Sequence, residues 1–212
     1  MIENIGNLIS KVFYRGIIDT GCNDDEKRHG LSRYVGKSIV WFDISANKKK
    51  SQKRTKGGSY INEEEKRIIL EILDDLKSTG ELKGLDIGII TGYSGQKELL
   101  RKSIKATGLD KIASKIDINT LDAFQGREND IIIYSTVRTR DSIGFQKEKE
   151  RVNVAFSRAK KLLIVCGDKN FFYNFDDQDN KFVEIIDYIS EGEECEIIQC
   201  DGGKLFERES NS

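Results

Sequence analysis

The segment 118–167 constrains the fold more than any other part of this 212-residue sequence. It contains two apolar runs, IIIYSTV and LLIVCG, which predict buried strands because they are rich in β-branched residues. A turn carrying Gly126, Arg127 and Glu128 precedes the first run. A helix carrying Arg158 is expected before the second. Since α/β sheets build ligand sites at strand ends, the pattern predicts polar clusters at this sheet.

The rest of the chain continues this alternation of strand and helix patterns. Alternating elements favour an α/β domain whose mainly parallel, doubly wound sheet is flanked by helices. An additional edge strand is expected over 193–200. The other strands are expected over 38–44, 85–91, 116–119, 130–137 and 162–166. Helices are expected over 2–13, 62–79 and 96–106, and one or two more over 171–187.

The helix that starts after Asn62 has the clearest local signals. Asn62 is a favourable N-cap, and the acidic residues Glu63, Glu64 and Glu65 complement the helix dipole. Glu65 occupies the position that completes a capping box, and Gly80 is expected to end the helix.

Whole-chain charge gives no reason to expect nucleic-acid binding, because the formal net charge is −1. Any basic surface must therefore be local. Six Lys or Arg residues lie between Lys48 and Lys56, inside an expected loop insertion over 45–60. Two interpretations stay open: a solvated insertion, as most charge blocks are, or a contact to nucleic-acid phosphates.

Other residue types exclude several classes of protein. The four cysteines form no C-x-x-C pair, Cys166 lies in an apolar strand, and His29 is the only histidine, so no metal site is expected. No apolar run is long enough to cross a bilayer, and no secretory signal begins at Met1. We therefore expect no membrane partner and a cytoplasmic location.

Three segments, in order, resemble helicase motifs. Gly88 to Gln96, GIITGYSGQ, resembles motif IV of superfamily 1 helicases, in the branch that contains the nonsense-mediated-decay helicase; Gly92 stands where that family usually has proline. TLDAFQGRE, from Thr120 to Glu128, resembles motif V. RVNVAFSRAK, from Arg151 to Lys160, resembles motif VI.

The resemblance implies the second RecA-like domain of an ATP-dependent helicase or translocase, a P-loop NTPase fold, over residues 1–200, with a disordered tail over 201–212. The sequence contains no G-x-x-x-x-G-K-[ST] and no D-E-x-x box. ATP and Mg²⁺ are therefore expected to bind mainly to a first RecA-like domain, a partner outside this sequence, as in a truncated or split chain. The fragment alone is expected to be inactive.

The resemblance assigns nucleotide-directed roles within motifs V and VI. Hydrolysis requires positive charge at the γ-phosphate, and Arg158 is the candidate arginine finger. Glu128 is expected to accept hydrogen bonds from the ribose hydroxyls, and Gly126 to let the backbone approach phosphate. Gln125 is a candidate coupling residue. Arg151 is a second phosphate candidate, with pairing to Glu148 as the alternative.

The same resemblance assigns a track for single-stranded DNA or RNA. The hydroxyls of Thr91 and Thr120 are expected to hold strand phosphates, contacts that fix register without reading sequence. Tyr93 is expected either to stack on a base or to pack in the core. Arg127 extends the track.

Two other classes of protein are alternatives to a helicase domain. A stand-alone RecA-like module could bind nucleic acid or a partner without turnover, and a natural start without a neighbouring phosphate loop would favour it. A nuclease is disfavoured because the acids show no P-D…[DE]-x-K pattern and proline is absent.

Overall fold

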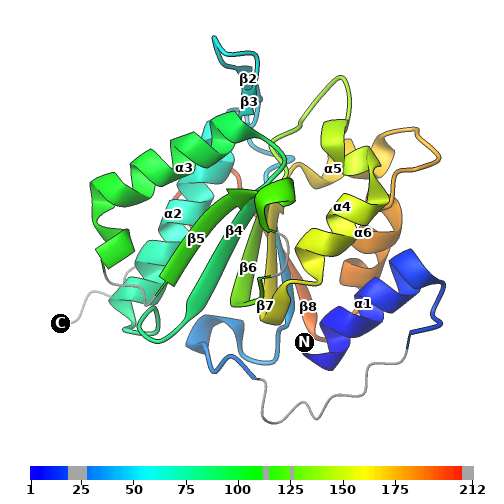
Figure 1. The fold of residues 1–212 in the computed structure, drawn as a ribbon, viewed down its shortest axis with the longest axis horizontal. Coiled ribbons are helices and arrows are strands. Elements are labelled where there is room, and N and C mark those ends of the chain that lie inside the picture. Colours follow the sequence, from blue (N-terminus) through cyan, green and yellow to red (C-terminus); the bar gives the residue numbers. More distant parts are fainter. Residues whose placement is uncertain (19–27, 112–114, 125–126, 207–212) are drawn as a thin grey trace.

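The computed structural model describes residues 1–18, 28–111, 115–124 and 127–206. Its centre is a six-stranded sheet in which every neighbouring pair of strands is parallel, in the order β5-β4-β6-β7-β1-β8 (Figure 1). The strands are β1 (Ile39–Asp43), β4 (Asp86–Thr91), β5 (Lys115–Thr120), β6 (Asn129–Ser135), β7 (Ala159–Gly167) and β8 (Cys195–Gln199). The parallel α/β architecture predicted from the sequence is confirmed.

Helices cover both faces of this sheet (Figure 1). One face carries α2 (Glu63–Ser78) and α3 (Ser94–Thr107). The other carries α1 (Glu3–Tyr14), α4 (Lys149–Phe156), α5 (Lys169–Asn174) and α6 (Phe182–Glu191). Short 3₁₀ turns connect these helices and strands: η1 (Ser32–Tyr34), η2 (Leu109–Lys111), η3 (Leu121–Phe124) and η4 (Gly144–Lys147).

The alternation of side chains along each strand explains the two cores. In β6, Ile132 and Tyr134 pack under α4, whereas Ile131 and Ile133 pack under α2 and α3. Successive residues of a strand point to opposite faces, so a strand buried on both sides must be apolar throughout. This is why the run IIIYSTV has no polar alternation.

The N-terminus of α2 follows one sequence prediction and departs from another. The Asn62 side chain accepts hydrogen bonds from the backbone N–H groups of Glu64 and Glu65, which confirms the cap. The predicted capping box is wrong, because the Asn62 N–H donates to Gln96 Oε1 at 2.8 Å and the Glu65 carboxylate turns into the protein. The stripe of isoleucines that follows Glu65 lies on the same helix face and draws the carboxylate inward.

Two segments expected to be irregular have defined contacts. Within 45–60 the chain forms a ribbon whose strands, β2 (Lys53–Arg54) and β3 (Tyr60–Ile61), are antiparallel. In the expected tail, Leu205 N donates to Glu71 Oε2 at 2.8 Å, and the Phe206 ring packs on Phe42. Residues 201–206 therefore contact the domain, and the remainder of the predicted tail lies outside the described residues.

Candidate functional site

The carboxyl ends of the parallel strands form one polar edge, here called the carboxyl edge. Thr91 ends β4, Thr120 ends β5 and Ser135 ends β6, and the three are register partners across the sheet. Ligand sites in open α/β sheets lie outside the carboxyl ends of strands. The two threonines of the predicted strand track are thus brought together here.

The amino ends of β6 and β7 form a second cluster at the opposite end, here called the amino edge. Asn129 begins β6 and pairs in register with Ala159, which begins β7. Glu128 and Arg158 immediately precede these two residues in the chain, so the structure also brings these predicted nucleotide-directed residues together. Thr91 and Thr120 therefore lie at the opposite end of the sheet from Glu128 and Arg158, whereas Arg127, predicted for the track, lies at the amino edge beside Glu128.

Arg158 lies in the turn between α4 and β7, two residues beyond the helix, so the prediction that the helix itself carries Arg158 is wrong. Its N–H donates to Ala155 O at 3.3 Å, which tightens the last turn, and its carbonyl accepts from Asn129 N at 3.1 Å, which begins the sheet ladder. The Nε atom is buried, and within the described ranges no group accepts its hydrogen. The Arg158 guanidinium also forms no ion pair with any described carboxylate.

The other two arginines of the prediction are already paired. Arg127 is exposed, and its guanidinium lies 2.6 Å from Asp117. Arg151 Nε lies 2.7 Å from Glu148, the alternative partner expected from the sequence, and its guanidinium also lies 3.7 Å from Asp122.

Arg151 lies in the first turn of α4, whereas Arg158 lies two residues beyond the end of this helix. The two arginines therefore lie near opposite ends of α4. Arg151 instead stacks over the Phe145 ring, 5.3 Å from its centre.

The remaining motif V residues are placed only in part. Glu128 is exposed at the amino edge, where its carboxylate is accessible to a ligand. Gln125 and Gly126, predicted to couple and to approach phosphate, lie outside the described residues.

At the carboxyl edge, two of the three residues predicted to contact a nucleic-acid strand are covered by other parts of the protein. Thr91 is 0% exposed, and its Oγ1 accepts from Tyr93 N at 3.4 Å. Tyr93 packs between the rings of Tyr60 and Phe145, with centroids 5.7 and 5.4 Å away, so its ring is not available to stack on a base. Burial raises the pKa of Tyr93 to about 12. Thr120 is half-buried and keeps an accessible surface.

A buried carboxylate under the carboxyl edge was missed from the sequence. Glu65 is 0% exposed and accepts from Ser135 Oγ at 2.6 Å, Thr136 Oγ1 at 3.1 Å and Val137 N at 2.8 Å. Val137 has φ 68°, a rare conformation for a β-branched residue. Glu65 thus holds the turn that leaves β6. The spacing of Glu65 with Ile68, Ile69 and Ile72 was the signal for its burial.

Desolvation is the main reason that the pKa of Glu65 rises to about 8, and hydrogen bonds from Ser135, Val137 and Thr136 oppose this rise. Gln96 links the same cluster to the start of α2, because its side chain donates to Ser135 Oγ and to Asn62 O. This network joins the start of α2 and α3 to the end of β6.

Neither a metal cluster nor a membrane helix is found within the described ranges. No group of three or more His, Cys, Asp or Glu residues there is arranged to hold a metal ion. No helix there is long and apolar enough to cross a membrane. Cys166, Cys195 and Cys200 are buried free thiols, as the sequence predicts for Cys166.

The parallel sheet between two helical layers, with polar clusters at both ends of its strands, defines a RecA-like α/β domain. A family model described as "AAA domain" matches residues 1–170. The chain belongs to this family and, within it, to the superfamily 1 helicase domains of the nonsense-mediated-decay helicase branch. The resemblance seen in the sequence is confirmed.

The relatives that carry this assignment are much longer proteins. The chain is 36% identical over 178 residues to Helicase SEN1 of Saccharomyces cerevisiae, covering 79% of this chain and 8% of that protein. It is 32% identical over 167 residues to the ATP-dependent helicase NAM7 of the same yeast, covering 75% and 17%. It is 38% identical over 116 residues to a regulator of nonsense transcripts 1 homolog of Neurospora crassa, covering 53% and 10%. The chain spans less than a fifth of each.

Proposed function

We propose that this chain is the second RecA-like motor domain of an ATP-dependent nucleic-acid helicase or translocase. It supplies Arg158 to ATP held by a first RecA-like domain, and it supplies part of the track for a single strand of DNA or RNA. The observation that carries the proposal is the contrast among the motif arginines: Arg127 and Arg151 pair with carboxylates, whereas Arg158 pairs with none in the described ranges.

An unpaired guanidinium with a buried Nε is suited to stabilise charge on a phosphate. Arginine stays protonated at any physiological pH and presents a planar fork of donors that matches phosphate oxygens. Arg158 sits in a short turn anchored at both ends by backbone hydrogen bonds, to Ala155 and to Asn129, so little reorganisation is needed when it meets an anion. Arginine fingers act in this way at the γ-phosphate.

ATP with Mg²⁺ would supply the phosphoanhydride bond, and the residues of this chain fit only part of its binding. Glu128 is exposed beside Arg158, where its carboxylate suits the ribose hydroxyls. Gly126 and Gln125 precede this pair in the sequence and are proposed to approach phosphate and to couple the nucleotide to the track. Arg151 is a weaker candidate because it is paired at the other end of α4. With no phosphate loop in the sequence, hydrolysis requires the partner domain.

The strand track lies at the carboxyl edge, where Thr120 is the accessible member of the predicted set. The structure changes the proposed roles of its neighbours: Thr91 and Tyr93 support the edge from below, and the Arg127 side chain is held by Asp117. A hydroxyl contact to phosphate positions a strand but carries no sequence information. The proposed track is therefore independent of sequence.

The test of the proposed function compares this chain with a protein that joins it to a first RecA-like domain carrying a phosphate loop. With a single-stranded oligonucleotide present, we expect the joined protein to hydrolyse ATP at about 1 s⁻¹ or faster, and the chain alone to stay at background. Release of inorganic phosphate measures both. Hydrolysis by the chain alone at the joined rate would contradict the half-site proposal, and no hydrolysis by the joined protein would favour a non-catalytic module.

A smaller effect is expected at the track. Thr120→Ala in the joined protein should weaken binding of a single-stranded oligonucleotide by about tenfold or more, since a hydrogen bond to a charged phosphate contributes about 1.5–3 kcal/mol. Fluorescence anisotropy at fixed salt measures the affinity. Thr107→Ala, at the far end of α3, is the matched control and should leave affinity unchanged. Equal affinity of the Thr120→Ala variant and the unmodified protein would remove Thr120 from the track.

A further inference from the structure

The segment 45–60 folds into a basic hairpin, defined here as residues 48–61 with β2 and β3 as its arms. Figure 1 shows it projecting beyond the carboxyl edge, next to the start of α3. No Asp or Glu occurs from Ile44 to Asn62. Five of its cations are exposed, namely Lys48, Lys49, Lys53, Arg54 and Lys56. None of the five pairs with a carboxylate of the described chain.

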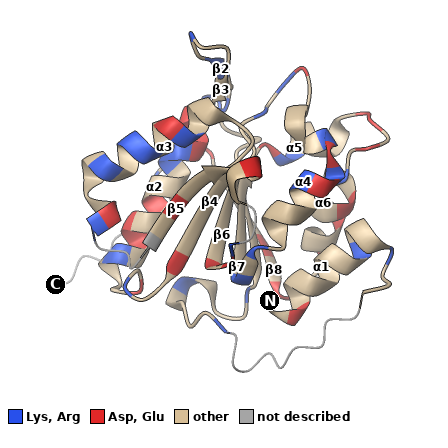
Figure 2. Ribbon diagram, in the orientation of Figure 1, with Lys and Arg blue, Asp and Glu red and all other residues tan. Residues whose placement is uncertain are grey.

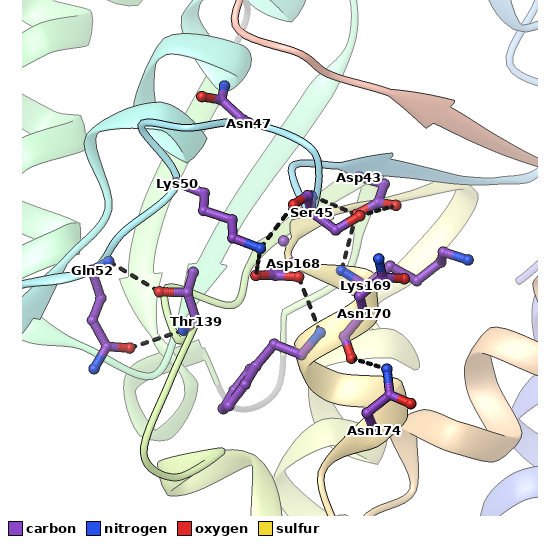
Figure 3. A network of polar contacts seen from close by, with 12 residues as sticks. Asp43, Ser45, Asn47, Lys50, Gln52, Thr139, Asp168, Lys169, Asn170 and Asn174 are labelled. Atoms are coloured by element: carbon purple, nitrogen blue, oxygen red, sulfur yellow. Dashed lines mark hydrogen bonds and ion pairs between the residues drawn. The ribbon is translucent and has the colours of Figure 1, made fainter.

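The start of the hairpin is anchored to the sheet by a polar network (Figure 3). Lys50 Nζ lies 2.7 Å from Asp168 Oδ2, and Asp168 is itself 1% exposed and caps α5. Gln52 and Thr139 bond each other reciprocally: Gln52 N donates to Thr139 Oγ1 at 3.1 Å, and Thr139 N donates to Gln52 Oε1 at 2.9 Å. The basic segment is therefore held against the ends of β6 and β7.

The end of the hairpin is anchored to α3. Ser59 Oγ accepts from Gly95 N at 3.0 Å. A Cβ added at Gly95 would lie 3.1 Å from Tyr60 O, so the hairpin lies directly on the first turn of this helix. The Tyr60 ring contacts the Tyr93 ring. The Arg138 guanidinium lies over the Tyr60 ring, 4.2 Å from the centre of that ring.

These anchors argue against a solvated insertion. Fixing a segment costs conformational entropy, and the ion pair between half-buried Lys50 and buried Asp168 costs partial desolvation of both charges. A loop that only projects into solvent requires neither an ordered backbone nor an ion pair to the domain. Close cations without counter-charges also repel one another, and this repulsion is relieved when a polyanion lies across them. Figure 2 places the hairpin apart from the acidic residues of the helices.

We propose that the basic hairpin binds the phosphate backbone of a single nucleic-acid strand where that strand leaves the carboxyl edge. Its five exposed cations lie on a hairpin whose end contacts the first turn of α3 at the carboxyl edge, and its tip, Thr55 to Ser59, contains no apolar side chain that could wedge between bases. The contact is electrostatic and independent of sequence. This proposal rests on the proposed function only for the class of ligand, a single nucleic-acid strand.

The test measures binding of this chain to a fluorescein-labelled oligo(dT) by anisotropy over a range of salt concentrations. We expect K53Q/R54Q/K56Q to bind on the order of tenfold more weakly at 50 mM salt, and its slope of log affinity against log salt to fall by about 2, since each phosphate contact on a single strand contributes about 0.7. Because the three side chains are exposed, the substitutions should leave the fold intact, which circular dichroism verifies.

The matched control removes the same charge from the other end of the domain: K77Q/K83Q/K105Q, three exposed lysines at the ends of α2 and α3 and in the loop before β4. It should keep the unmodified affinity and slope. The proposal is overturned if the hairpin variant equals the unmodified chain, if the control loses as much affinity, or if the unmodified chain binds no strand at 50 mM salt. ATP hydrolysis by the joined protein tests the proposed function separately.

Discussion

Arg158→Ala, in a protein that joins this chain to its first motor domain, is expected to lower kcat for ATP hydrolysis by about 10³-fold while nucleotide binding stays nearly unchanged. The guanidinium stabilises charge that develops on the γ-phosphate in the transition state, and it contributes less to the ground state. Steady-state hydrolysis with saturating oligonucleotide measures kcat, and a fluorescent nucleotide analogue measures affinity.

Two further variants make this result specific. Arg158→Lys keeps the charge but loses the planar fork, so its rate should fall between those of the unmodified protein and Arg158→Ala. Arg101→Ala removes an exposed arginine from α3 and should leave kcat unchanged. Hydrolysis by Arg158→Ala at a near-normal rate would exclude Arg158 as the finger, whatever the binding data show.

Glu65→Ala is expected to destabilise the isolated chain by about 2–4 kcal/mol, a large share of the stability of a domain. It removes the acceptor of the Val137 N–H and of the Ser135 and Thr136 hydroxyls, all buried. It also releases the left-handed turn at Val137. Urea unfolding followed by the fluorescence of Trp41, the single tryptophan and fully buried, measures the loss.

The control for this prediction lies two residues earlier. Glu63→Ala removes a partly exposed carboxylate of the same helix turn, which pairs with Lys66, and should change stability by less than about 1 kcal/mol. Equal losses for the two alanine variants would show that the helix dipole, and not the buried network, accounts for the effect of Glu65.

The raised pKa of Glu65 also predicts how stability depends on pH. Between its ordinary value of 4.5 and about 8, the folded chain keeps a proton that the unfolded chain has lost. The contribution of Glu65 to the free energy of unfolding therefore falls as pH rises through this window, by at most about 1.4 kcal/mol per pH unit. Glu65→Gln, neutral at every pH, should flatten this part of the profile. An unchanged profile would mean that Glu65 is ionised in the folded chain.

The fold class, the family and the Asn62 cap of α2 could be predicted from the sequence alone. Apolar runs such as IIIYSTV predict buried parallel strands because both faces of the sheet are covered. Asn62 predicts a helix start because its side chain reaches only neighbouring N–H groups. The cap depends on interactions within a few residues, and burial on both faces of the sheet leaves a continuous apolar run, so both are visible in the order of residues.

Only the packing of distant segments shows which of the predicted site residues are accessible and which of the arginines are paired with a carboxylate. Arg127, Arg151 and Arg158 look alike in the motifs, yet Asp117 on β5 neutralises Arg127, and Glu148 with Asp122 neutralises Arg151. The partners of these side chains come from other strands and turns, and the register of the parallel sheet selects them. The same long-range packing buries Thr91 and turns Glu65 from a predicted cap into the centre of a buried network, because whether a polar group faces water depends on segments far away in the chain.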